Sequence, residues 1–212
     1  MKYSFVGPIY RHVTKDSYAD QFVTGESIRV STFQTCRDYE DEEQGDPGEG
    51  HMYHLNTHIT DDHPRFHELT SQFGMDLRGA EGVVFGNNLR RDVVSDAYVI
   101  CFSLEVFGED LRKKFGGYPV RVNDITAFMW PLLRAMNKVV PVHTWLYGPA
   151  VYHDRMYLDF DAPPGHICLV KPPFPFKPQR EFRLVITCHP GHIYKPFNVS
   201  MPYFKSVSRR VP

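Results

Sequence analysis

Proline and glycine recur throughout the chain and divide it into short segments. The 212 residues include 17 prolines and 15 glycines. Both residue types interrupt helices and strands, and both favour turns. Between them lie short runs rich in β-branched and aromatic residues, a pattern that is typical of strands. We therefore predict an α+β fold, in which a β-rich core of short, mostly antiparallel strands is accompanied by a few helices.

The size and composition favour one folded unit. Hydrophobic residues make up 42% of the chain and aromatic residues 14%, which is enough to build a core. No internal repeat is present, so we predict a single domain over residues 1–212. The formal net charge is -1, so no global field attracts nucleic acid or an anionic membrane.

Nothing in the sequence indicates a membrane or secreted protein. No apolar run approaches the roughly 18 residues of a membrane span. The first residues are too short and broken a stretch for a signal peptide. The four cysteines are widely spaced and form no Cys-x-x-Cys pair of the zinc or redox type. We expect a cytoplasmic protein with free thiols and no membrane partner.

Local patterns predict the individual elements. Residues 15–24 have helical spacing, with Thr14 or Asp16 as N-cap and Gly25 as C-cap. Residues 104–115 and 123–138 are further helices, and Asn123 or Asp124 caps the second. Strands are predicted at residues 8–14, 27–33, 95–103, 139–145, 150–160, 167–170 and 182–187. Residues 74–92 are expected to be loop or short strand, and residues 192–212 an exposed tail.

Two polar segments are candidate metal sites, although simpler interpretations are open for both. Residues 38–50 carry seven carboxylates, which suit calcium, but they lack EF-hand spacing and also fit a solvated loop. Residues 51–67 contain five histidines, among which His54 and His58 have the spacing of a zinc pair. Surface histidines are the alternative there. A metal-dependent hydrolase is the function that these segments would support.

A third polar segment precedes the predicted strand 182–187. Gln179, Glu181 and Arg183 are expected to share one face of that strand, and Arg180, Phe182 and Leu184 the other. Two residues along a strand span about 7 Å, so an amide and a carboxylate would stand side by side on a rigid element. Such a pair suits catalysis. An ordinary polar strand start is the alternative.

Three separated pieces combine into one possible site. The first is Tyr10-Arg11-His12, the second is a hydroxyl strand containing either Ser31-Thr32 or Ser103, and the third is Gln179-Arg180-Glu181. An arginine binds a pyrophosphate through paired hydrogen bonds. A serine could hold a ribose or position the carboxylate. A glutamate could bind a ribose hydroxyl and stabilise an oxocarbenium-like centre as nicotinamide leaves.

In these pieces and their order, the chain resembles the ADP-ribosyltransferase superfamily of the arginine–serine–glutamate type. The stretch from Ile9 to Thr14, followed by a helix and Gly25, is similar to the family's Tyr-Arg/His-x-Thr opening. Gln179-Arg180-Glu181 is similar to its Gln-x-Glu form, which occurs in relatives that modify asparagine or guanine. The resemblance implies an ADP-ribosyltransferase-like fold.

The resemblance also implies a function. NAD would be the donor substrate, Arg11 would grip its phosphates, and His12 and Thr14 would belong to the same binding segment. Glu181 would be the catalytic carboxylate and Gln179 an acceptor-side group. The acceptor would be a protein or a nucleic acid, and the protein a toxin or phage-defence effector with a possible antitoxin or regulator as partner.

The chain also resembles a little-characterised bacterial group with an early Asp-Pro-x-Glu-Gly, a central Phe-Ser strand and a late Glu-x-Glu-x-Arg. Asp46-Pro47-Gly48-Glu49-Gly50, Phe102-Ser103 and the segment 179–183 carry this similarity, which names no activity.

Some choices stay open at the level of sequence. The chain has no full Ser-Thr-Ser, and Ser31-Thr32-Phe33 comes only 20 residues after Arg11, so the hydroxyl strand is either this one or that of Ser103. Arg11 and His12 should point to opposite faces, so either could face NAD. A non-catalytic nucleotide- or protein-binding module is a further alternative.

Overall fold

The computed structural model describes residues 7–42, 44–201 and 207–211. Its main component is an eight-stranded, antiparallel sheet, joined by a three-stranded and a two-stranded sheet, which confirms the predicted α+β class. The helices are α1 (Asp16–Thr24), α2 (Phe33–Arg37), α3 (Phe66–Gln72), α4 (Glu109–Phe115), α5 (Ile125–Met136), α6 (Pro173–Phe176) and a 3-10 turn at Lys177–Gln179. The strands are β1 (Ile9–Val13), β2 (Ile28–Thr32), β3 (His51–Thr60), β4 (Val84–Val93), β5 (Tyr98–Ser103), β6 (Tyr118–Val122), β7 (Val142–Pro149), β8 (Val151–Tyr152), β9 (Met156–Leu158), β10 (Val170–Lys171), β11 (Glu181–Cys188), β12 (Phe197–Val199) and β13 (Ser208–Arg210).

The large sheet forks at β5. Along one edge, β5 pairs with β11 over its whole length. Along the other edge, β2 pairs with Tyr98 and Val99, whereas β1 pairs only at Ser103. The residues of β5 between these points have no registered strand partner on that edge. β1 and β2 therefore part from one another beside the middle of β5, and the carbonyl of Cys101 accepts a hydrogen bond from the Arg11 side chain there.

The main hydrophobic core lies on one face of this sheet. Alternate residues of the central strands point into it, including Ile100 of β5 and Leu184 of β11, both fully buried. Helices α1 and α5 cover this face through side chains such as Phe22 and Phe128, whose rings stack at 5.8 Å. Because the apolar residues occupy one face, the opposite face is left for polar residues of the same strands.

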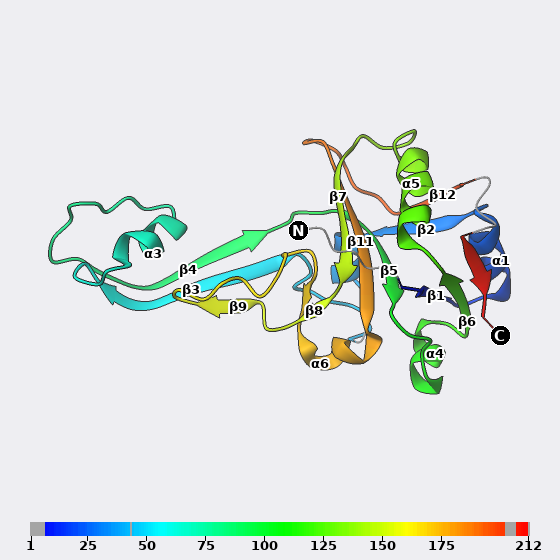
Figure 1. The fold of residues 1–212 in the computed structure, drawn as a ribbon, viewed down its shortest axis with the longest axis horizontal. Helices are drawn as coiled ribbons and strands as arrows, with labels where there is room; N and C mark the ends of the chain where they lie inside the picture. The colour runs from blue at the N-terminus through cyan, green and yellow to red at the C-terminus, as the bar shows by residue number, and fades with distance from the viewer. Residues whose placement is uncertain (1–6, 43, 202–206, 212) are drawn as a thin grey trace.

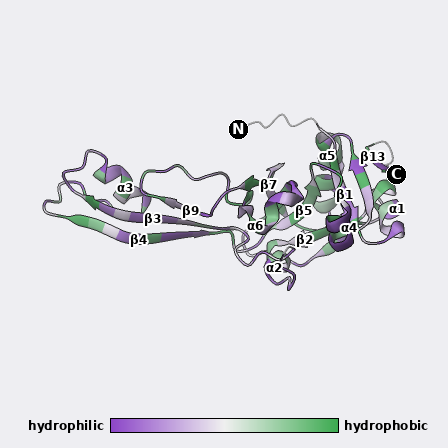
Figure 2. Cartoon of the chain, turned by 90° about the horizontal axis from the view of Figure 1, so that it is seen from below, coloured by the Kyte–Doolittle hydropathy of each residue, from purple (hydrophilic) through white to green (hydrophobic). Residues whose placement is uncertain are grey.

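A long arm extends from the sheet. Strands β3 and β4 pair over ten residues each, and β9 lies parallel to β3. Figure 1 shows this arm reaching away from the body, with α3 at its far end. Figure 2, seen from below, shows hydrophilic stretches along its strands. Ile59, Phe66, Leu69 and Phe85 form a separate small core inside it.

Several element predictions are confirmed. Helix α1 ends at Gly25, whose φ of 71° is the left-handed C-cap conformation that glycine favours. Helix α5 begins after Asp124, whose side chain accepts hydrogen bonds from the amides of Thr126 and Ala127. The N-cap prediction for α1 is wrong, because Lys15 holds that position and makes no side-chain cap.

Other element predictions are wrong. Residues 74–92, expected to be loop or short strand, contain most of the ten-residue strand β4. The expected tail 192–212 contributes β12 and β13 to the sheet. The strand predicted at residues 139–145 continues to Pro149 as β7, and the one predicted at 150–160 is divided into the short strands β8 and β9. In the part of the chain that the structure describes, no helix is both long and apolar enough to cross a membrane.

Candidate functional site

The fork brings the separated sequence pieces together. Arg11 of β1, Ser31 of β2, Ser103 of β5 and Glu181 of β11 all line one pocket, together with Gln179. The pocket has a volume of about 250 Å³. Residues that lie up to 170 positions apart in sequence thus meet at the point where β1 and β2 separate.

Strand register explains why Ser31, Ser103 and Glu181 share a face. Arg11 instead lies opposite the core residue Val120 and reaches the pocket at the fork, where it donates to the Cys101 carbonyl. In antiparallel pairs, residues directly opposite one another point to the same side of the sheet. Glu181 lies opposite Ser103, and Arg183 lies opposite Cys101. Ser31 lies opposite Val99 on the same strand, β5. One face of β2, β5 and β11 therefore carries the polar groups, while the other carries the core.

Gln179 reaches the pocket differently from what the alternation predicts. It belongs to the 3-10 turn before β11, and Arg180 has a left-handed conformation with φ 42°. The strand consequently begins at Glu181, so Gln179 does not share a regular strand face with Glu181 and Arg183. It is nevertheless buried and lines the pocket.

Glu181 is held by two cations. Its carboxylate lies 2.9 Å from Lys171 Nζ and 3.0 Å from Arg183 Nε. Its backbone N–H donates to the hydroxyl of Tyr152 at 2.7 Å. Burial by itself would raise the pKa of Glu181, but Arg183 and Lys171 hold it well below its usual range. Glu181 is thus ionised and fixed in orientation.

Arg183 continues the network to a second carboxylate. Its guanidinium donates to both oxygens of Glu49, at 2.6 and 2.7 Å, and each of these side chains is 1% exposed. Burial would lower the pKa of Arg183, but Glu181 and Glu49 raise it well above its usual value. Nearby, Asp46 forms an ion pair with Arg155. The expectation of a merely solvated acidic loop is therefore wrong for Asp46 and Glu49.

Lys171 was missed by the sequence analysis. It lies in β10, opposite Tyr152 of β8, so one short parallel pair supplies two of the partners of Glu181. Its ammonium group also lies 4.2 Å from the centre of the Phe176 ring. A lysine that ends an apolar run just before a proline pair was the only signal for it in the sequence.

Arg11 is a cation without an acidic partner. Its guanidinium donates to the Cys101 carbonyl, and it contacts no carboxylate among residues 7–42, 44–201 and 207–211. Burial lowers the pKa of Arg11 from its ordinary value. Since arginine stays charged at neutral pH, it leaves one positive charge in the pocket wall without a carboxylate.

His12 also lines the pocket, but as a neutral group. Its ring stacks on Phe107 at 4.0 Å, and its Nε2 accepts the Phe107 backbone N–H at 3.3 Å. Burial lowers the pKa of His12 to about 4. Its Nδ1 is buried and has no hydrogen-bond partner within the described part of the chain. Both Arg11 and His12 thus border the pocket, and only Arg11 brings charge.

The hydroxyl candidates have different environments. Ser103 donates to the Glu105 carbonyl at 2.5 Å and lies directly across from Glu181. Ser31 borders both this pocket and an adjoining cavity of about 580 Å³. Thr14 borders only the adjoining cavity. Thr32 is buried, and its side chain caps α2 by accepting the Thr35 amide. Of the hydroxyl residues predicted from the sequence, Ser31 and Ser103 therefore border this pocket, whereas Thr14 and Thr32 do not.

Aromatic side chains and the acidic segment complete the pocket wall. Phe107 and Phe115, whose ring centroids are 5.4 Å apart, line it together with Tyr39. Gln44, from the acidic segment, donates to the carbonyl of Lys114 at 3.4 Å and so connects that segment to the end of α4. The wall therefore combines ring surfaces with the charged groups of the sheet face.

The histidine segment does not form a comparable site. Most of it is strand β3, and His54 is fully buried between Tyr157 and Phe73, with Nε2 at 2.7 Å from the Asp159 carbonyl oxygen. The expectation of surface histidines is therefore wrong for His54. Within the described residues, no group of three or more His, Cys, Asp or Glu side chains is placed to hold a metal ion.

No family model, curated protein or solved structure matches the chain. The chemistry of the pocket must therefore be argued from its geometry. Two buried cations, Lys171 and Arg183, and the half-buried Arg11 lie near two buried carboxylates, Glu49 and Glu181. The excess positive charge favours an anionic ligand, because a buried charge needs a partner of opposite sign.

Proposed function

We propose that the protein is an NAD-dependent mono-ADP-ribosyltransferase that transfers ADP-ribose to a macromolecular acceptor. The observation that carries this proposal is the forked sheet, which gathers Arg11, two serines, Gln179 and Glu181 around one pocket. The split sheet and the chain order of these residues both fit an ADP-ribosyltransferase-like fold.

The charges of the pocket agree with a dinucleotide donor. Arg11 has donors free for a pyrophosphate, whose negative charge would offset the unpaired guanidinium. Phe107, Phe115 and Tyr39 offer ring surfaces for a base or for nicotinamide. Glu181 stays ionised at neutral pH, as a carboxylate must if it is to stabilise positive charge on the ribose while nicotinamide leaves.

The proposal is tested by nicotinamide release from NAD, with water or a cell lysate as acceptor. We expect turnover by the wild-type protein and a loss of roughly 100-fold or more for Glu181→Gln. Glu105→Gln is the matched control, because Glu105 forms an exposed ion pair with Arg180 and does not line the pocket. Absence of turnover by the wild-type protein would contradict the proposal.

Arg11→Gln gives a second, independent variant, since Glu181→Gln also disturbs a buried ion network. The loss of one charge-assisted contact should raise the KM for NAD by roughly tenfold or more. Urea unfolding of each variant separates lost function from lost folding. An unchanged KM would remove Arg11 from the donor site.

One observation favours a second candidate, an anion-binding module without catalysis. Glu181 is bound by both Lys171 and Arg183, which is also what a purely structural carboxylate requires. Such a module would bind pyrophosphate-containing nucleotides, seen as a thermal shift of the wild-type protein, and release no nicotinamide.

A further inference from the structure

One transverse row of residues crosses five strands of the sheet and passes through the pocket. Arg209 of β13 lies opposite Arg121 of β6, and Arg121 lies opposite Tyr10 of β1. Tyr10 in turn lies opposite Ser103, which lies opposite Glu181. Since directly opposed residues of antiparallel strands point to the same side, this row runs along the face that carries the candidate site.

The far end of the row is unusual because two arginines oppose each other. Like charges at directly opposed positions destabilise a sheet. Within the described ranges, neither the Arg121 nor the Arg209 side chain forms a hydrogen bond or ion pair, and Arg121 Nε is buried without a partner. A bound anion would relieve both the repulsion and the unsatisfied donor.

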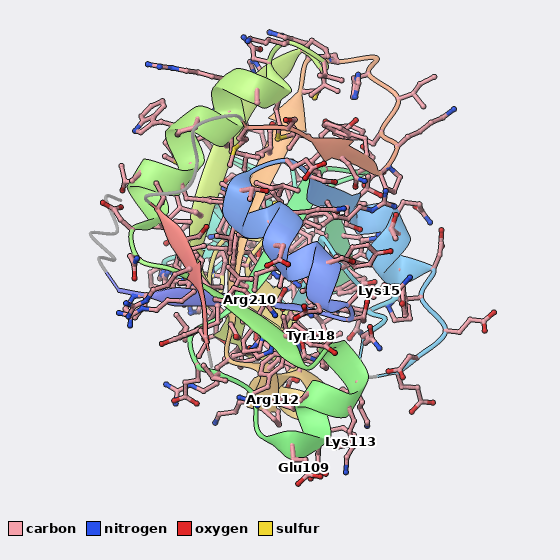
Figure 3. All side chains as sticks on the ribbon, turned by 90° about the vertical axis from the view of Figure 1, so that its right-hand side faces the viewer. Lys15, Glu109, Arg112, Lys113, Tyr118 and Arg210 are labelled. Carbon is pink, nitrogen blue, oxygen red and sulfur yellow. The ribbon has the colours of Figure 1, made fainter. Side chains whose placement is uncertain are left out.

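The neighbouring Arg210 differs from Arg121 and Arg209 because its side chain has carboxylate partners. It points to the other side of β13, where Asp16 and Asp20 of α1 bind its guanidinium. Figure 3 views this end of the molecule and shows Arg210 beside α1. Asp16 and Asp20 thus neutralise Arg210, whereas Arg121 and Arg209 have no carboxylate partner within the described residues.

We infer that the macromolecular acceptor is single-stranded nucleic acid, whose backbone follows this row from Arg209 and Arg121 to Glu181. The inference rests on the proposed function. Strands are spaced by about 4.8 Å, so Arg121 lies roughly 14 Å and Arg209 roughly 19 Å from Glu181, a distance that a few nucleotides cover. A phosphate at the arginine pair therefore places a nearby base at the pocket.

A single strand fits the row better than a duplex or an acidic peptide. Glu181 is 5% exposed, so an acceptor base must leave its stack to reach it. Tyr10, half-buried between Arg121 and Ser103, offers a ring on which a base can stack. Phosphates follow one another at short, regular intervals, which suits cations set in a straight row. The net charge of -1 does not oppose this, because the contact is local.

The test measures binding of a labelled, mixed-sequence single-stranded oligonucleotide by fluorescence anisotropy over a range of salt concentrations. The variants are Arg209→Gln and Arg121→Gln/Arg209→Gln. Arg78→Gln is the matched control, since Arg78 is an exposed arginine that pairs with Asp76 on the arm. Arg209 is itself exposed, so its single variant keeps the test valid should the double variant fold poorly.

We expect the double variant to reduce the salt slope by about 1.4, which is roughly a 25-fold loss of affinity at 0.1 M salt if affinities converge at 1 M. Arg78→Gln should bind like the wild type, and NAD hydrolysis without acceptor should be unchanged in every variant. The inference would be overturned if the wild type failed to bind the oligonucleotide or if neither variant altered binding. It would also be overturned if ADP-ribose from NAD were transferred to protein and not to the oligonucleotide. Absence of NAD turnover would instead contradict the proposed function, because the binding measurement does not depend on it.

Discussion

The ion pair between Glu49 and Arg183 offers the sharpest test of how the site is built. Both side chains are 1% exposed, and the guanidinium reaches both carboxylate oxygens at 2.6 and 2.7 Å. Replacing Glu49 with glutamine keeps the shape but removes the charge. It also turns an amide NH₂ toward a guanidinium that has only donors, so one of the two contacts becomes repulsive.

The magnitude follows from burial. Removing one partner of a buried ion pair costs about 3–5 kcal/mol, because the remaining charge is left uncompensated. For a chain of this length each kcal/mol lowers Tm by about 2–4 °C, so Glu49→Gln should lower Tm by roughly 6–20 °C. Urea unfolding followed by the fluorescence of Trp130 and Trp145 measures the free energy of unfolding directly.

The chain offers a matched control for this substitution. Arg65 and Glu68 form the same two-pronged pair on α3, but each side chain is 49% exposed. Glu68→Gln should leave the urea midpoint unchanged, because exposed ion pairs contribute little. If Glu49→Gln were as mild as Glu68→Gln, the reasoning from burial would be refuted. In a double-mutant cycle, Arg183→Met added to Glu49→Gln should cost less than the sum of the two single changes, because the second change removes the stranded charge.

Two further predictions concern groups around the pocket. The pKa of His12 is about 4 in the folded protein and about 6.5 in the unfolded chain, so its contribution to stability is complete above pH 6.5 and is lost as pH falls toward 4. Over this window the free energy of unfolding of the wild type, measured with urea, should fall by at most about 2 kcal/mol more than that of His12→Gln. Equal pH dependence of the two free energies would contradict the prediction. Tyr152→Phe removes the hydroxyl that accepts the Glu181 N–H and should cost about 1–3 kcal/mol; a neutral change in the urea midpoint would show that the amide finds another partner.

Local patterns predicted the parts of the fold that depend on neighbours in sequence. The run of mostly β-branched or aromatic residues at 182–187 identified β11, and Asp124 followed by an apolar stripe identified α5. Gly25 marked the end of α1 because its backbone needs a positive φ. The candidate residues Arg11, Ser103 and Glu181 were also found in this way, since each lies in or beside a strand.

Features that depend on pairing between distant segments were not predictable. Gly86-Asn87-Asn88 has the composition of a turn, yet β4 passes through it because β3 pairs with β4 at nine positions on both sides of Asn87. β7 continues to Pro149, which an edge strand tolerates because one side of β7 needs no donor. Lys171 reaches Glu181 only because β10 pairs with β8, and no local sequence pattern predicts this pairing.

The charge balance of the pocket connects its construction to its chemistry. Lys171 and Arg183 both form ion pairs with Glu181 and fix its orientation, and Arg183 forms a second ion pair with Glu49. The two positive and two negative charges of these four groups therefore balance. Arg11 stands outside this set, bonded only to a carbonyl that the fork leaves without a strand partner. The same divergence of β1 and β2 that opens the pocket thus leaves Arg11 available to an anion. Under the proposed function, Glu181, ionised and fixed on β11 across β5 from Arg11, would stabilise the positive charge that develops as the donor breaks.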